Sequence, residues 1–294
     1  MMTHQSPAAA KRRLHSSLPG LKPLLLALAA QCLLLSPVHA DSTDEIARFL
    51  NGQACLRSDL RYVSAPGVRL KEIDLRGAYM FNINLSNARL LGARMESSNL
   101  EAANLERADL SRANLSRATL TAASLSGVTL IGATLQQVVA NQTNFTAADL
   151  SNADLTTADL RGSRFISAFA EDAIFGTADL RGSNFSQARL SGARFTRANL
   201  TGADFSAARL PSANLRRAQM AGINLAGANL AYADLSAAVM KGANLTGADL
   251  TGANLSNADL QNADLTGAEL TSALLEGANT CGAKLPAGMK PTPC

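Results

Sequence analysis

The chain has 294 residues but no tryptophan, three tyrosines and three histidines, and every histidine (His4, His15 and His39) lies within the first 40 residues. Without histidine in residues 41–294, that part cannot build Ser–His or Cys–His nucleophile systems or histidine-ligated metal sites. No glycine-rich loop follows a strand pattern and opens a helix, so a phosphate-binding loop is not indicated. The shortage of aromatic residues argues against a platform for stacking sugars. The sequence therefore predicts no catalytic residue, no cofactor-binding residue and no metal ligand.

Long apolar segments are also missing. The stretch Leu24–Leu35 has 12 residues, too few to span a bilayer, and no later segment is long enough. Four basic residues accompany it, and Val38–Ala40 offers a small-residue cleavage site. Residues 1–40 are therefore predicted to be an export signal, leaving a mature chain without a stable membrane anchor. The expected location is the periplasm, the cell exterior or, in a photosynthetic host, the thylakoid lumen. The Arg12–Arg13 pair leaves the general secretory and twin-arginine routes both open.

The mature chain has no excess charge of either sign. The four basic residues of the leader account for the formal charge of +4, because 27 − 4 leaves 23 Lys and Arg against 23 Asp and Glu. A neutral chain gives no reason to expect nucleic acid or an anionic membrane as a partner. The charge is nevertheless uneven: residues 107–217 hold 12 Arg and 8 acids, whereas residues 218–280 hold one Lys and six acids.

What the sequence has in abundance is a repeat of five residues. From Leu70 to Leu275 every fifth position is apolar, which makes 42 consecutive positions: 30 Leu, six Phe, four Met and two Ala. Two positions earlier the residue is almost always Ala, and the residue between them is polar. The two residues after the apolar centre are turn formers such as Thr-Gly or Ser-Asn. A period of five fits neither an amphipathic helix nor an alternating strand, so the chain is predicted to be a repeat solenoid.

Each unit is read as a three-residue strand followed by a two-residue bend, a pattern that winds into coils stacked about 4.8 Å apart. Several phenylalanines recur every twenty residues, which indicates four units per coil and an aromatic ladder; they are Phe145, Phe165, Phe185 and Phe205. The pattern loosens at residues 136–144 and 166–174, where Ala140 and Ala170 replace the large central residue. A local bulge or kink is expected at both places.

These A-(N/D)-L-x-x units, for example Ala148–Asn152 and Ala253–Asn257, resemble the pentapeptide-repeat family over about 70% of the chain. The resemblance implies an all-β fold, a right-handed quadrilateral β-helix of about ten coils with a core filled by side chains. It also implies a function to be weighed, because some members mimic DNA, bind DNA gyrase and confer quinolone resistance. That role requires a cytoplasmic location and an acidic surface, which the export signal and the neutral mature charge disfavour.

The ends of the repeat are expected to be capped, since a solenoid otherwise exposes unpaired backbone. A short helix is predicted over residues 42–51, with Ser42 and Glu45 at capping-box spacing and Gly52 as its stop. The predicted divisions are 1–40 signal peptide, 41–69 N-terminal cap, 70–279 repeat and 280–294 C-terminal cap or tail. In an oxidising compartment Cys281 and Cys294 can form a disulfide that closes the tail. Cys55 lies at the other end, with burial as a small hydrophobic residue or an intermolecular bond as its alternatives.

With twenty residues per coil, four arginines are predicted to share one face: Arg194, Arg197, Arg216 and Arg217. They are either part of a mixed, solvated surface or a docking patch for an acidic partner. The sequence thus predicts a non-enzymatic, exported scaffold that presents the faces of a rod to a protein partner of unknown identity, with self-association left open. A weakly Ca²⁺-binding cell-envelope scaffold is a further alternative. The outward Asp149 is expected to be replaceable by Ala with almost no effect, because it faces water.

Overall fold

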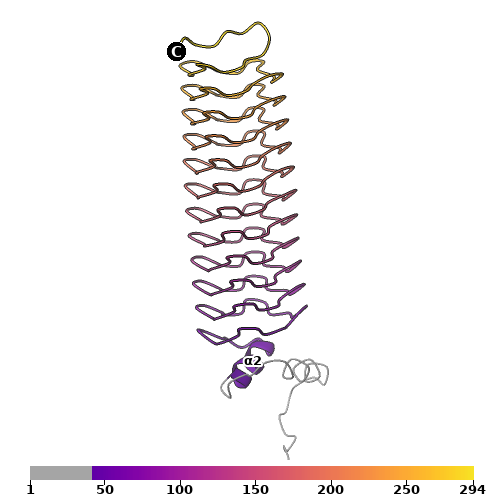
Figure 1. Ribbon diagram of the computed structural model, residues 1–294. Coiled ribbons are helices and arrows are strands. Elements are labelled where there is room, and N and C mark those ends of the chain that lie inside the picture. Colours follow the sequence, from indigo (N-terminus) through magenta and orange to yellow (C-terminus); the bar gives the residue numbers. More distant parts are fainter. Residues whose placement is uncertain (1–41) are drawn as a thin grey trace, which may run out of the picture. The chain divides into compact units, whose positions relative to one another are not determined.

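The computed structural model describes residues 42–294, which form one short helix followed by a stack of coils (Figure 1). The helix, α2 (Ser42–Leu50), is the only one in this range, and no segment there forms a continuous strand. The predicted export signal, residues 1–40, lies outside the described residues. No helix between residues 42 and 294 combines the length and the apolar character needed to cross a membrane.

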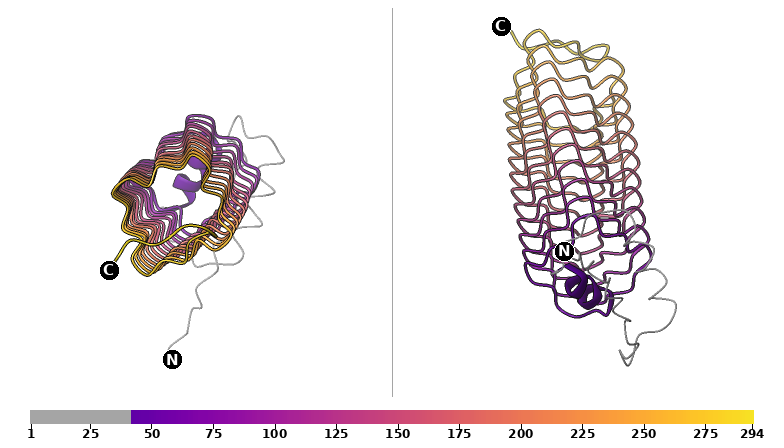
Figure 2. Two further views of the ribbon diagram at one scale, coloured as in Figure 1. Left: turned by 90° about the horizontal axis from the view of Figure 1, so that it is seen from above. Right: turned by 60° about the horizontal axis from the view of Figure 1, so that its bottom comes forward.

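Successive coils are joined by parallel β-bridges of one residue each. The bridging residue is the polar one before each apolar centre, and it pairs with the residue twenty positions later, as in Asp74 with Arg94. A spacing of twenty gives four units per coil, and bridges continue from Asp59 to Lys284 without a slip. Seen along the stack in Figure 2, the coils superpose on a single outline. Contacts between coils also reach below residue 70, because the N–H of Cys55 donates to Asp74 O at 2.8 Å.

A tight turn follows every apolar centre and forms a corner of the coil. In the turn after Leu75, the N–H of Ala78 donates to Leu75 O at 3.1 Å, and the second turn residue, Gly77, has φ = 66°. A positive φ favours glycine at this position. Many other residue types adopt it here as well, among them Asn152 at 59° and Arg217 at 56°. The corner geometry is therefore imposed by the stacking of coils as well as by the local sequence.

The apolar centres and the alanines fill the interior. Central Leu, Phe and Met side chains are fully buried along almost the whole stack. The predicted aromatic ladder is confirmed: the rings of Phe145 and Phe165 stack at 4.7 Å, and those of Phe165 and Phe185 at 4.3 Å. A second ladder, Phe175 on Phe195 at 4.8 Å, meets the first edge-on from the opposite side of the coil. Each coil thus packs its neighbours through identical contacts at the bridge spacing.

The expected bulges at Ala140 and Ala170 are absent, and that prediction was wrong. The neighbouring outward residues keep their bridges in both directions, since Val139 pairs with Thr119 and Asp159, and both alanines are fully buried. Ala170 lies between two larger central residues, Phe165 and Phe175, whose rings contact each other at 6.1 Å. Phenylalanine is larger than leucine, so two rings beside Ala170 compensate for volume that its small side chain leaves in the core.

Helix α2 covers the first coil. Phe49 is fully buried, and Gly52 ends the helix as predicted, with φ = 73° and its N–H donating to Phe49 O at 3.0 Å. The Glu45 carboxylate accepts the N–H of Asp59 at 2.7 Å. In every later coil the corresponding N–H donates to a carbonyl of the coil before it, as Tyr79 does to Ser58 O at 2.9 Å. Glu45 therefore takes the place of the coil that is missing below the first one.

The C-terminal residues cross the last coil. The N–H of Thr280 donates to Thr292 Oγ1 at 2.9 Å, and the N–H of Thr292 donates back to Thr280 Oγ1 at 2.8 Å. The residue after Thr280, Cys281, forms a disulfide with Cys294, and their Cα atoms are 5.0 Å apart. These contacts tie the end of the chain to one side of the stack.

Candidate partner-binding surface

The stack has four faces, each carrying one column of outward residues spaced twenty apart. We count the turn after each outward residue as part of the same face. Face A begins at Asp59, face B at Ser64, face C at Arg69 and face D at Asp74. The four predicted arginines meet on face D. Arg194 bridges Asn214 in the next coil, and the N–H of Arg197 donates to Arg216 O at 3.0 Å. Arg217 follows in the same turn as Arg216.

All four side chains are exposed, and none forms an ion pair with any residue in the range 42–294. Residues 181–220, the two coils that carry them, contain seven Arg and a single acid, Asp204. Asp204 is on face B and accepts a hydrogen bond from Asn224 there. The positive charge of face D is thus not neutralised by its own coils.

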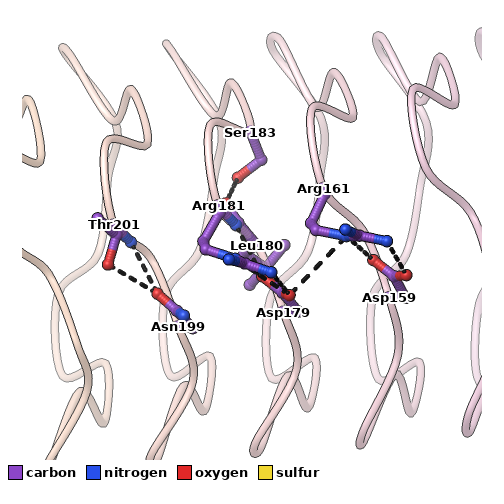
Figure 3. Close-up of polar contacts among 8 residues, drawn as sticks. All are labelled: Asp159, Arg161, Asp179, Leu180, Arg181, Ser183, Asn199 and Thr201. Carbon is purple, nitrogen blue, oxygen red and sulfur yellow. Dashed lines mark hydrogen bonds and ion pairs between the residues drawn. The ribbon is translucent and has the colours of Figure 1, made fainter.

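Some arginines elsewhere in the stack are neutralised by a local pattern. In each Asp-Leu-Arg triplet the guanidinium turns back onto the carboxylate two residues earlier. Figure 3 shows two such pairs on face A, Arg161 with Asp159 at 2.8 Å and Arg181 with Asp179 at 2.6 Å. Hydrogen bonds from these arginines lower the pKa of both aspartates below the usual value. The pairs are half-exposed, so their effect on stability is small.

Face D has an asparagine where such a pair would need an aspartate. Asn214 precedes Arg216 by two residues, and its Oδ1 accepts hydrogen bonds from the N–H of Arg216 and from Thr196 Oγ1, both at 3.1 Å. The amide holds the backbone of the turn but has no charge with which to retain the guanidinium. Arg216 is consequently left available to a ligand.

The three cysteines of residues 42–294 offer no reactive site. Cys281 and Cys294 are oxidised to a disulfide. Cys55 is fully buried beneath α2, and burial raises the pKa of its thiol. Within residues 42–294, no three His, Cys, Asp or Glu side chains gather closely enough to hold a metal ion. The chemistry that this surface offers is recognition of negative charge.

Three residues on face C belong beside the face D arginines and were missed from the sequence. Phe169 occupies an outward position and is 37% exposed, and the guanidinium carbon of Arg189 lies 4.9 Å from the centre of its ring. Arg209 bridges Arg189 in the next coil. The signal was available, because an aromatic residue at an outward position breaks the polar column of the repeat.

Comparison with known proteins agrees with the repeat geometry. The sequence matches the family described as pentapeptide repeats in eight copies, the first at residues 67–101 and the last at 243–279. The chain belongs to the pentapeptide-repeat family. No curated protein matches it significantly.

Solved structures of other pentapeptide-repeat proteins are similar to this chain. HetL, involved in heterocyst differentiation regulation in the cyanobacterium Nostoc sp. strain PCC 7120, is 28% identical, with 85% of this chain and 99% of HetL covered and a TM-score of 0.37. QnrB1, a plasmid-mediated fluoroquinolone resistance protein, is 25% identical, with 52% of this chain and 82% of QnrB1 covered and a TM-score of 0.43. A thylakoid-lumen protein of Arabidopsis thaliana is 42% identical over 32% of this chain and 65% of its own, with a TM-score of 0.31.

Proposed function

We propose that this pentapeptide-repeat protein is an exported, non-enzymatic scaffold whose stack, a right-handed quadrilateral β-helix, presents face D to a protein partner. The observation that carries the proposal is the group of four exposed arginines on face D without an ion pair in the described range. Arginine is enriched at protein interfaces because its planar guanidinium binds carboxylates through two hydrogen bonds at once. The partner surface is therefore acidic.

Two features of the sequence support the rest of the proposal. The basic residues, short apolar stretch and small-residue site within residues 1–40 support export. The absence of histidine from residues 41–294 supports a role without catalysis. A rigid stack with a filled core suits such a role, because it holds surface side chains in fixed positions.

The main alternative is a DNA-mimicking protein that binds gyrase, as implied by the family. Mimicry of a duplex requires negative charge along the stack. Here the two coils of residues 181–220 carry seven Arg and one acid, which makes the middle of the stack positive. A weakly Ca²⁺-binding scaffold of the cell envelope is a second alternative, which would show itself as a rise of the thermal midpoint on adding Ca²⁺.

Photo-crosslinking in the source cells tests whether a protein partner binds at face D. A photoreactive residue in place of Ala237, one coil above Arg217 on face D, should capture a partner. The same residue in place of Ala147, at the equivalent turn position on another corner, is the matched control. Asn214→Asp should weaken the capture, because the new carboxylate would retain Arg216 as Asp179 retains Arg181. Equal capture from both positions, unaffected by Asn214→Asp, would contradict the proposal.

Cell fractionation with intact mass measurement under non-reducing conditions tests export. The expected product lies outside the cytoplasm, begins at Asp41 and is lighter by about two hydrogens because of the disulfide. A full-length cytoplasmic product with three free thiols besides Cys32 would remove the export proposal. It would also make a gyrase inhibition assay the next step.

A further inference from the structure

The arginines of face D continue around the edge of the stack onto face C, and together with Phe169 they form one surface. Arg189 and Arg209 on face C are exposed and, like Arg194, Arg197, Arg216 and Arg217 on face D, form no ion pair in residues 42–294. Phe169 and Ile174 are outward residues of the coil directly below, where they bridge Arg189 and Arg194. We define the arginine tier as Arg189, Arg194, Arg197, Arg209, Arg216 and Arg217, and the apolar tier as Phe169 and Ile174.

From this arrangement we propose that the surface binds a short acidic peptide segment of a partner protein, anchored by one apolar or aromatic side chain on the apolar tier. The inference rests on the proposed interaction role of face D and specifies the chemistry of the partner. Buried aromatic and arginine side chains carry most of the binding energy at protein interfaces. Phe169 with Arg189 over its ring supplies both in a single contact.

Carboxylates around this surface limit how far it extends and determine which part of the ligand is acidic. Asp149 and Asp154 bridge Phe169 and Ile174 from the coil below, and Asp234 bridges Asn214 from the coil above. Asp172, at the edge between Phe169 and Ile174, disfavours an acidic residue at the apolar tier. The ligand therefore places its apolar residue there and its acids on the arginine tier.

The available length fits a few residues only. The apolar tier and the two arginine coils span two coil spacings, about 10 Å, and an extended peptide rises about 3.3 Å per residue. A segment of about four residues covers this distance. A longer polyanion such as single-stranded nucleic acid, which needs several nucleotides in a continuous basic groove, would meet the flanking carboxylates.

A binding experiment with a defined probe tests the proposal. The probe is a dye-labelled peptide with a single phenylalanine flanked on both sides by alternating Asp and Glu, and its partner probe has Ser in place of Phe. Fluorescence anisotropy with the disulfide-bonded chain, residues 41–294, should show the Phe peptide binding at least fivefold more tightly. Phe169→Ala should remove this preference and leave binding of the Ser peptide unchanged.

Charge reversal tests the arginine tier. Arg197→Glu with Arg217→Glu should weaken binding of the Phe peptide at least tenfold. The matched control is Arg107→Glu with Arg112→Glu, two exposed arginines at equivalent turn positions with φ values of 55° and 56°, against 58° and 56° for Arg197 and Arg217. This control should change binding less than twofold. Thermal unfolding of each variant confirms that it is folded.

Three results would overturn the inference: no peptide binding at low salt, equal loss from both pairs of reversals, or tighter binding of an eight-nucleotide DNA strand or heparin than of the Phe peptide. The outcome is separable from that of the proposed function. If crosslinking at face D captures a partner but the peptide does not bind, the inference fails and the scaffold role stands. If the peptide binds as described but no partner is captured, the inference stands and the scaffold role fails.

Discussion

The outward Asn or Asp of each unit secures the turn that follows it. The first turn residue points its N–H away from the neighbouring coils, and the side-chain oxygen two residues earlier accepts it: the N–H of Ser151 donates to Asp149 Oδ1 at 3.0 Å. The hydroxyl of Ser151 donates to the same oxygen at 2.7 Å. This explains why the repeat prefers Asn and Asp at a position that faces water.

Asp149→Ala should therefore destabilise the protein, contrary to the expectation from sequence that it would have almost no effect. The loss of the two hydrogen bonds is worth about 1 kcal/mol, which corresponds to a fall of about 2–4 °C in the thermal midpoint for a chain of this size. The matched control is Thr129→Ala, one coil below in the same column, since no hydrogen bond of the Thr129 side chain is formed within residues 42–294. Equal midpoints for the two variants would show that the turn does not depend on the carboxylate.

Hydrogen-bonded aspartates also make the stability of the folded state depend on pH in the acidic range. Asp264 accepts from Thr266 Oγ1 at 2.6 Å and from Lys284 Nζ at 2.9 Å, and these bonds lower its pKa from 3.8 to about 2. A pKa below that of the unfolded chain gives stability that is complete above about pH 4 and is lost as pH falls toward 2. The pKa values of Asp74 and Asp159 are lowered in the same direction, mainly by hydrogen bonds from Arg76 and Arg161.

The thermal midpoint should thus be nearly constant from pH 7 to pH 5 and fall steeply between pH 4 and pH 2. Asp264→Asn, which keeps an acceptor but cannot titrate, should flatten the lower part of this curve. A midpoint that already falls between pH 7 and pH 5 would contradict the assignment, because no group with a lowered aspartate pKa titrates there.

At the scale of the element, α2 acts as a substitute for a coil. Glu45→Ala should leave the N–H of Asp59 without the acceptor that the carboxylate provides at 2.7 Å. An unsatisfied donor costs about 1–3 kcal/mol, and the loss is local because each coil contacts only its neighbours. Amide exchange should accelerate in residues 55–65 while the coils around Phe185 keep their protection. Glu45→Gln retains an oxygen acceptor and should preserve most of the protection; equal acceleration in both variants would place the stabilising effect elsewhere in α2.

The elements differ in how far they follow from the sequence. The period of five, the coil of twenty residues and the phenylalanine ladder could all be read from spacing, because identical units must repeat identical contacts. The placement of Arg194, Arg197, Arg216 and Arg217 on face D followed from the same arithmetic. The absence of an ion pair at Arg216 did not, since it depends on the direction that the turn gives the guanidinium relative to the side chain two residues earlier, which is Asn214 here and Asp179 for the paired Arg181. The role of Glu45 was likewise hidden, because it joins a helical residue to the first coil fourteen residues later, outside the five-residue repeat.

At the scale of residues 42–294 as a whole, the two ends of the stack are closed to different degrees. Below, α2 covers the first coil. At the C-terminal end, the last residues cover only part of the final coil, where Thr292 Oγ1 accepts the N–H of Thr280. In the described range the N–H groups of Leu270 and Leu275 have no backbone partner, and both side chains are only partly buried. A row of free donors beside apolar side chains is a site for pairing between chains.

The disulfide limits this exposure by holding the last residues on the coil. Cys281→Ser with Cys294→Ser should release them, remove the Thr280–Thr292 contacts and lengthen the open edge. Because a stack transmits such a loss only to neighbouring coils, amide exchange should accelerate in residues 265–285 and the main thermal midpoint should change little. The longer open edge should also raise the apparent mass in light scattering as the protein concentration increases. Uniform acceleration through the Phe145–Phe205 ladder would instead mean that the disulfide stabilises the whole stack, and that its coils unfold as one unit rather than from the ends.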